Sequence, residues 1–333
     1  MKKIALIIPY FGKFPNYFPL FLNSCRCNPT IDWLLVTDIS DEYDYPDNIH
    51  VVPMTFPELR EKIQRRFDFQ IALERPYKIC DYRPAFGLIF QEYLCDYDFW
   101  GYCDIDLLFG DLRAFFPDEK LECYDKVGHL GHLALYRNTE CVNTAFMASI
   151  AGAERYREVL STEHNFIFDE WDDLSINRIF LKLGLRVWLW NDFFDAHPSR
   201  DNLVRVTREI DPGSDYHDTQ RLDRKGSWIT WEDGHIYAWH HGQDYARKTE
   251  LAYAHFQKRS MEIRCDLDER RILCLPDGFE PYRDQIFAKH RLWAACHRLL
   301  DHKHLKRQYL EIRYWLIVKT APLRHKFRKK HIE

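Results

Sequence analysis

The chain has 333 residues, 46% of them hydrophobic and 29% charged, which is enough to build one large core or two smaller ones. Its formal net charge is −4, and no run of 18 apolar residues is present, so no membrane-spanning helix is expected. The 10 cysteines show no CxxC spacing, which argues against a zinc ribbon or a disulfide framework. We therefore expect reduced thiols and a cytoplasmic protein.

The first part of the chain alternates between strand and helix patterns. Apolar runs predict strands at residues 2–11, 31–39, 48–56 and 99–109. The first run is too short for a signal peptide and ends at Pro9. An amphipathic segment covers residues 17–25, and helical spacing predicts helices at 56–67 and 82–94. Such alternation indicates an α/β sheet, in which ligands bind beyond the carboxyl ends of the strands.

The pattern becomes mixed after residue 115. Strands are predicted at residues 126–138 and 185–192, helices at 142–147, 153–161 and 172–184, and a hairpin at 226–241 within a loop-rich stretch. No internal repeat or low-complexity tract is present.

Two carboxylates, Asp104 and Asp106, follow the apolar part of the predicted strand at 99–109. Alternate strand residues point to the same side, so both carboxylates should face one ligand. Left unpaired in a dry place they would cost several kcal/mol each, so a positive partner is expected. Their oxygens suit a divalent cation that neutralises a departing nucleotide diphosphate. A D-x-D often arises by chance as a solvated turn, but the apolar run before this one argues against a loose loop.

The segment 97–112 resembles the metal-binding strand end of GT-A glycosyltransferases, which use nucleotide-sugar donors. The K-x-x-D-x-R pattern of Lys78, Asp81 and Arg83 upstream strengthens this resemblance. The first 260 or so residues are similar to a group of bacterial capsule and O-antigen biosynthesis proteins of this fold. The resemblance implies a Rossmann-type mixed sheet flanked by helices, a UDP-sugar donor, and a divalent cation, Mn²⁺ before Mg²⁺.

The same resemblance implies a domain organisation and a set of donor ligands. A GT-A domain would span residues 1–260, with a nucleotide-sugar-binding half at 1–115 and an acceptor-side half at 116–260, followed by a helical basic region at 261–333. The implied binding residues are Pro9, Tyr10, Phe11 and Asp38 for the nucleoside, and Lys78, Asp81, Arg83 and Lys258 for the diphosphate and sugar. Alternatively, Lys78 and Arg83 belong to an exposed helix start, and Asp81 favours a helix dipole.

Four acids, Asp169, Glu170, Asp172 and Asp173, crowd the start of the predicted helix at 172–184. Capping and the helix dipole explain one or two of them. In GT-A enzymes an acid at this place deprotonates the acceptor hydroxyl or binds the donor sugar. Asp172 matches the D-x-D-x-x-N helix entry of lipopolysaccharide galactosyltransferases, although the second acid of that pattern is replaced by a leucine. The candidates are therefore Asp172 first, then Glu170 and Asp169.

Many GT-A metal sites include a late histidine, and His255 is the first candidate for that ligand here. It is followed within one turn by Lys258 and Arg259, and such cations suit a diphosphate. His240 and His241 remain alternatives.

The stretch 286–333 contains 13 Lys/Arg against 3 Asp/Glu. With apolar residues between the charges, it predicts an interfacial helix and a polybasic patch on an anionic cytoplasmic leaflet. The alternative is a helix packed on the domain with a solvated charged face. Nucleic-acid binding is not expected.

These patterns predict a metal-dependent glycosyltransferase on the inner face of the cytoplasmic membrane. It would move a hexose from a UDP-sugar to a glycan acceptor for a surface polysaccharide, and we expect this acceptor to be lipid-linked. The rival interpretations are a phosphohydrolase with Asp104 as nucleophile and a non-catalytic glycan-binding or scaffold subunit. The sequence leaves open the donor sugar, the acceptor, the linkage, the stereochemistry and the oligomeric state.

Overall fold

The structure is a computed structural model that describes residues 1–170, 174–196, 203, 205–209, 219–222, 227–240, 248–257, 259 and 261–283. The chain divides into two compact units, Met1–Pro198 with Asn202–Pro281, and Ser199–Asp201 with Tyr282–Glu333. The predicted basic helix at 286–333 lies outside the described residues. The elements below all belong to the first unit.

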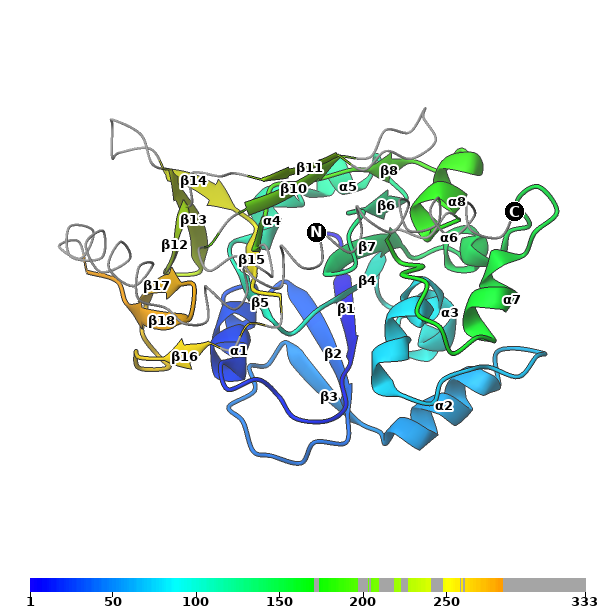
Figure 1. The fold of residues 1–333 in the computed structure, drawn as a ribbon, viewed down its shortest axis with the longest axis horizontal. Coiled ribbons are helices and arrows are strands. Elements are labelled where there is room, and N and C mark those ends of the chain that lie inside the picture. The colour runs from blue at the N-terminus through cyan, green and yellow to red at the C-terminus, as the bar shows by residue number, and fades with distance from the viewer. Residues whose placement is uncertain are drawn as a thin grey trace, which may run out of the picture. The chain divides into compact units, whose positions relative to one another are not determined.

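A seven-stranded sheet with the order β3-β2-β1-β4-β7-β6-β8 forms the centre of this unit (Figure 1). Its strands are β1 (Ile4–Pro9), β2 (Ile31–Thr37), β3 (Ile49–Pro53), β4 (Phe99–Cys103), β6 (Lys126–Val127), β7 (Leu133–Arg137) and β8 (Val187–Trp188). The strands β3, β2, β1 and β4 are parallel, whereas β7 is antiparallel to β4 and to β6. The sheet is therefore mixed.

Helices cover both faces of the sheet because side chains alternate along each strand. In β1, Ala5 and Ile7 enter one core, and Leu6 enters the other. The first core is closed by α2 (Phe56–Gln64), α3 (Phe86–Ile89), α6 (Glu140–Thr144), α7 (Arg155–Leu160) and α8 (Ile176–Lys182). The second is closed by α1 (Phe18–Arg26), α4 (Leu112–Phe115) and α5 (Asp118–Leu121), and Figure 1 shows α1 and α3 on opposite sides of the sheet. This arrangement confirms the predicted α/β class.

Two further sheets complete the unit, with the orders β11-β10-β9-β15-β5 and β14-β13-β12-β17-β18-β16. The first contains β5 (Leu107–Phe109), β9 (Phe194–Ala196), β10 (Arg205–Glu209), β11 (Thr219–Leu222) and β15 (Tyr253–His255). The second contains β12 (Ser227–Glu232), β13 (His235–His240), β14 (Lys248–Leu251), β16 (Glu262–Ile263), β17 (Arg271–Leu275) and β18 (Gly278–Pro281). The pairing of β12 with β13 confirms the predicted hairpin, which turns at Asp233 and Gly234 with φ of 51° and 86°. The strands β16 to β18 occupy a stretch where we expected helix, and the unit runs to Pro281.

Several predicted elements are shorter or broken. The strand predicted at 99–109 is two strands in different sheets, β4 and β5, and both aspartates lie in the link between them. The helix predicted at 82–94 is mostly 3-10 helix: η1 (Pro76–Ala85) runs into the short α3, followed by η2 (Gln91–Tyr93). Pro84 contributes to this because it has no N–H to donate. Of the strand at 185–192 only β8 remains, and the one at 126–138 is interrupted between β6 and β7. Another short 3-10 helix, η3 (Ala145–Met147), follows α6.

No helix among the described residues has the length and apolar character needed to cross a bilayer.

Candidate active site

A cavity of about 1040 Å³ lies at the carboxyl ends of β1 and β4. Its wall combines segments that are far apart in the sequence: the end of β1, the 3-10 helix η1, the link 103–106, the turn 130–132, the loop 165–170 and the end of β15. The volume is at the upper end of the range of about 300–1,000 Å³ for small-molecule sites. The cavity therefore has room for more than one small group.

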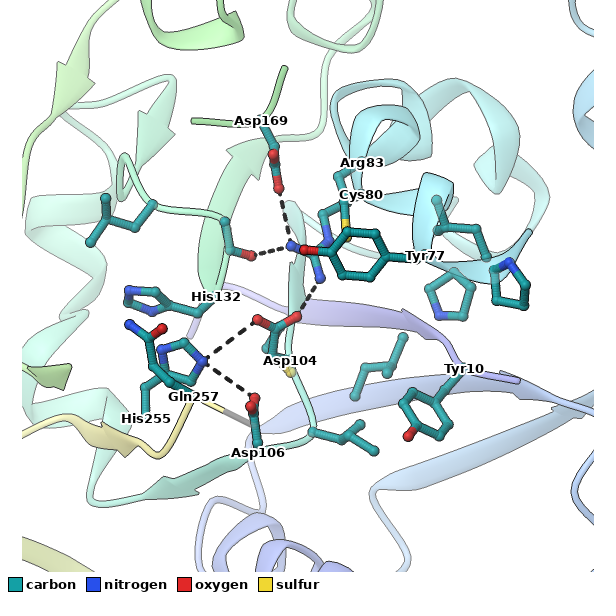
Figure 2. A pocket seen from close by; sticks show the side chains of 18 of the residues that line it. Tyr10, Tyr77, Cys80, Arg83, Asp104, Asp106, His132, Asp169, His255 and Gln257 are labelled. Carbon is teal, nitrogen blue, oxygen red and sulfur yellow. Dashed lines mark hydrogen bonds and ion pairs between the residues drawn. The ribbon is translucent and has the colours of Figure 1, made fainter. Parts of the chain in front are cut away.

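Asp104, Asp106 and His255 converge on this cavity (Figure 2). The Nε2 atom of His255 lies 3.3 Å from an oxygen of Asp106 and 3.8 Å from an oxygen of Asp104. Strand pairing explains the approach, because β15 is antiparallel to β5 with His255 opposite Leu107. A residue distant in sequence is thus fixed beside the aspartates.

Asp195 orients His255 through the ring nitrogen that lies away from the two aspartates. Its Oδ1 atom is 2.9 Å from Nδ1 of His255 and also accepts a hydrogen bond of 2.6 Å from Nε2 of Gln257. The parallel pairing of β9 with β15 places Asp195 opposite His255. Because Nδ1 is engaged, Nε2 is the ring nitrogen that faces the two aspartates.

The charges around this imidazole shift its titration. Burial would lower the pKa of His255, but Asp106 and Asp195 raise it well above its ordinary value. Burial would raise the pKa of Asp195, but the hydrogen bond from His255 lowers it below the ordinary range. The raised pKa favours the protonated imidazole, and a cation bound at Nε2 would replace that proton.

The donor set of Asp104, Asp106 and His255 fits a divalent cation. One ligand atom from each of the three residues lies within 4.8 Å of the others. Hard carboxylate oxygens with one imidazole nitrogen suit Mg²⁺ or Mn²⁺. A second group of His132, Asp195 and His255 meets the same distance criterion but is fully buried. The set with Asp104 and Asp106 is partly exposed, and it is therefore the one that a ligand could share.

Arg83 joins the aspartates to the acidic loop. Its Nη1 atom donates to Oδ2 of Asp169 at 3.0 Å and to the carbonyl of Gly131 at 2.7 Å, and its Nη2 atom donates to Asp104. Burial, opposed by Arg83, raises the pKa of Asp169 to about 7. Glu170 accepts a hydrogen bond from the amide of Gly131. Gly131 is required here because an added Cβ would lie 2.5 Å from Oδ2 of Asp169.

Lys78 and Asp81 are buried and bonded to each other, and only Asp81 of the two lines the cavity. The Lys78 ammonium donates to Asp81 at 2.8 Å, to the Val159 carbonyl at 2.9 Å and to the His164 carbonyl at 2.5 Å. Asp81 also accepts the amides of Phe166 and Phe168. All three ammonium protons are thus used within the protein. These contacts give the pair a structural role in holding the loop 159–168.

The other predicted residues divide into three groups. Pro9, Tyr10 and Phe11 line the cavity, and the Tyr10 hydroxyl donates to the Lys13 carbonyl at 2.9 Å. Asp38 is exposed after β2 and is not part of the cavity wall. Outside the described residues lie Asp172, Asp173, Lys258, His241 and the side chain of His240.

Sequence reasoning missed Asp195, His132, Gln257 and Gly131, all of which line the cavity. An acid inside the apolar run "FFDA" was a usable signal for Asp195, because a buried carboxylate needs a partner. Gly131 had no comparable local signal.

The fold and the site together define an α/β protein with an acid–histidine cluster at the carboxyl ends of its parallel strands. The chain belongs to a family of unknown function (DUF6625), whose profile matches residues 6–283. No curated protein matches the chain.

Two solved structures share a low similarity with the chain. The galactosyltransferase LgtC in complex with donor and acceptor sugar analogs is 14% identical, with a TM-score of 0.34 over 59% of this chain and 76% of that one. An active-site mutant of LgtC gives 14% identity and a TM-score of 0.35 over 59% and 75%.

Proposed function

We propose that the chain is a metal-dependent glycosyltransferase of the GT-A type, which transfers a hexose from a UDP-sugar to a glycan acceptor. The observation that carries the proposal is the convergence of Asp104, Asp106 and His255 at the carboxyl end of β4, on a cavity of about 1040 Å³. A bound divalent cation would neutralise the charge that develops on the leaving diphosphate.

The residues around this cluster have separate tasks in the proposed reaction. Asp104, Asp106 and the Nε2 atom of His255 hold the cation, and Asp195 keeps the imidazole in the required orientation. Arg83 reaches Asp104 from the opposite side, where a guanidinium can pair with a phosphate or a sugar hydroxyl. The wall at Pro9, Tyr10 and Phe11 receives the nucleoside.

The acid that acts on the acceptor hydroxyl or the donor sugar belongs to the acidic segment 169–173 of the sequence. Asp172 remains our first choice, and Glu170 and Asp169 follow. Both of the latter line the cavity, and Asp169 is already paired with Arg83. Glu170 accepts the amide of Gly131 at the same wall.

Calorimetry of UDP binding tests the proposal. With Mn²⁺ present, UDP should bind at least about tenfold more tightly than after chelation, a difference of roughly 1.4 kcal/mol. Asp106→Asn and His255→Ala should remove this metal dependence. Asp47→Asn, an exposed carboxylate just before β3 and outside the cavity wall, is the matched control and should keep it. Equal UDP affinity with and without metal would contradict the proposal.

We also propose a location and a pathway for this activity. The 13 Lys/Arg of residues 286–333 support attachment to the inner face of the cytoplasmic membrane, and hence a lipid-linked acceptor for a surface polysaccharide. The full-length protein should bind anionic vesicles at low salt and release them at about 0.5 M salt. It should not bind neutral vesicles. Failure to bind anionic vesicles would remove the membrane assignment and leave the reaction untouched.

A further inference from the structure

The cavity has an apolar part that the proposed donor site does not use. Six large hydrophobic side chains are strongly exposed in the described part of the chain, and only Tyr77 and Ile167 of these line the cavity. Tyr77 is 56% exposed and Ile167 is 47% exposed. Solvent-exposed apolar groups inside a ligand cavity indicate a contact surface for a ligand.

Tyr77 is displayed by the periodicity of η1. A 3-10 helix has three residues per turn, so Tyr77, Cys80 and Arg83 share one face, and all three line the cavity (Figure 2). The Tyr77 ring therefore adds an apolar surface to the face of η1 on which Arg83 supplies a charge.

Ile167 is displayed by a strained backbone. Its φ is 56°, in the left-handed region that β-branched residues rarely adopt. Two hydrogen bonds hold this conformation. The backbone amides of Phe166 and Phe168, on either side of Ile167, donate to Asp81 at 3.0 and 2.9 Å. Asp81 is held in turn by Lys78. A residue kept in an unfavourable conformation by a dedicated buried pair indicates a function for the side chain that it presents.

We propose that Tyr77 and Ile167 form an acceptor subsite that binds the apolar face of a hexopyranose ring. This inference rests on the proposed function. A pyranose has a face of C–H groups and a rim of hydroxyls, so it needs an apolar platform with hydrogen-bonding groups beside it. Asn165 and Glu170 line the same cavity and supply such groups. The nucleoside is assigned to Pro9, Tyr10 and Phe11, which leaves the Tyr77 platform to the acceptor.

Saturation-transfer NMR with methyl hexopyranosides as probes tests the subsite directly. The wild-type protein should transfer saturation to the ring C–H protons of at least one methyl hexopyranoside. Tyr77→Ala and Ile167→Gly should each reduce that transfer at least fivefold. Val51→Ala, which shortens an exposed apolar side chain outside the cavity, is the matched control and should leave it unchanged.

Thermal unfolding and UDP calorimetry separate this inference from a folding defect and from the proposed function. Ile167→Gly should melt at the same temperature as the wild type or higher, because glycine adopts a positive φ without strain. Tyr77→Ala should keep metal-dependent UDP binding within a factor of two. If UDP binds with metal but no methyl hexopyranoside gives transfer, or transfer survives both substitutions, the subsite is overturned and the donor site stands. If saturation transfer behaves as expected but UDP affinity does not depend on metal, the proposed reaction is wrong and the sugar-binding subsite remains.

Discussion

The two faces of the 3-10 helix η1 carry ionic groups with opposite roles. On one face, Lys78 and Asp81 are 0% and 1% exposed, and their bonds go to protein groups. On the other face, Arg83 is 13% exposed and reaches Asp104 at the wall of the cavity. A buried charge whose hydrogen bonds all go to protein groups contributes to the stability of the fold. A charge that shares its partners with an open cavity remains available to a ligand.

The buried face nevertheless shapes the site. Lys78 and Asp81 together bind backbone groups at Val159, His164, Phe166 and Phe168. This loop continues directly into Asp169 and Glu170, which contact Arg83 and Gly131. The ion pair thus positions the acidic wall of the cavity through the backbone of this loop.

Asp81→Asn should give the largest loss of stability. It leaves the Lys78 ammonium buried beside a neutral amide and weakens the acceptor of two backbone amides. Removing one partner of a buried ion pair costs about 3–5 kcal/mol. The measurement is denaturant unfolding of the wild type and the variant.

The double variant Lys78→Met with Asp81→Asn sharpens this test. If the two residues act as one pair, the double variant should lose less stability than the sum of the two single variants. Each single variant leaves one buried charge unpaired, whereas the double variant leaves none. Asp47→Asn is again the exposed control. Additive losses would show that Lys78 and Asp81 stabilise the loop independently.

Gly131→Ala should have an intermediate effect, and it acts on the cavity face. The added methyl group would lie 2.5 Å from Asp169 Oδ2, 2.8 Å from Glu170 Oε1 and 3.1 Å from Arg83 Nη1. Forcing these groups apart should cost about 1–3 kcal/mol of unfolding free energy and weaken metal-dependent UDP binding. Gly131 is not one of the glycines with a positive φ, so this cost would come from crowding and not from backbone strain. Unchanged UDP binding in Gly131→Ala would show that the Arg83–Asp169 contact is dispensable for the donor.

The sequence predicted the local elements and only part of the site. Alternating and continuous apolar runs gave the strands β1, β2 and β3, and the aspartate pair could be placed at the end of β4. The contact between Asp195 and His255 depends on pairing of β9 with β15, about sixty residues apart, for which no local signal exists. The K-x-x-D-x-R pattern, by its resemblance to the glycosyltransferases, predicts one ligand-binding unit. Because η1 is a 3-10 helix, its three-residue repeat sends the lysine and aspartate inward and the arginine outward.

Lys126 provides a last test of what a buried charge requires. It is as buried as Lys78, but its amine donates to the Asn177 side-chain oxygen at 2.7 Å and to the Gly128 carbonyl. Burial lowers the pKa of Lys126 to about 7, although Asp169 and Glu170 oppose the change. In the unfolded chain the lysine has its ordinary pKa of about 10.4. Between pH 7 and that value, the unfolded chain therefore binds one more proton than the folded protein.

The sign of the resulting pH dependence follows from this difference in bound protons. The unfolding free energy should rise with pH above pH 7, by about 1 kcal/mol per unit, because the unfolded state loses its advantage as protons become scarce. Lys126→Met removes the titrating amine, so its stability should lack this rise. Subtracting the two urea-unfolding curves at each pH cancels the thiols and tyrosines that both proteins share. Parallel stabilities from pH 7 to pH 9 would mean that Lys126 stays charged in the fold, and that an amide and a carbonyl can replace the carboxylate that Lys78 requires.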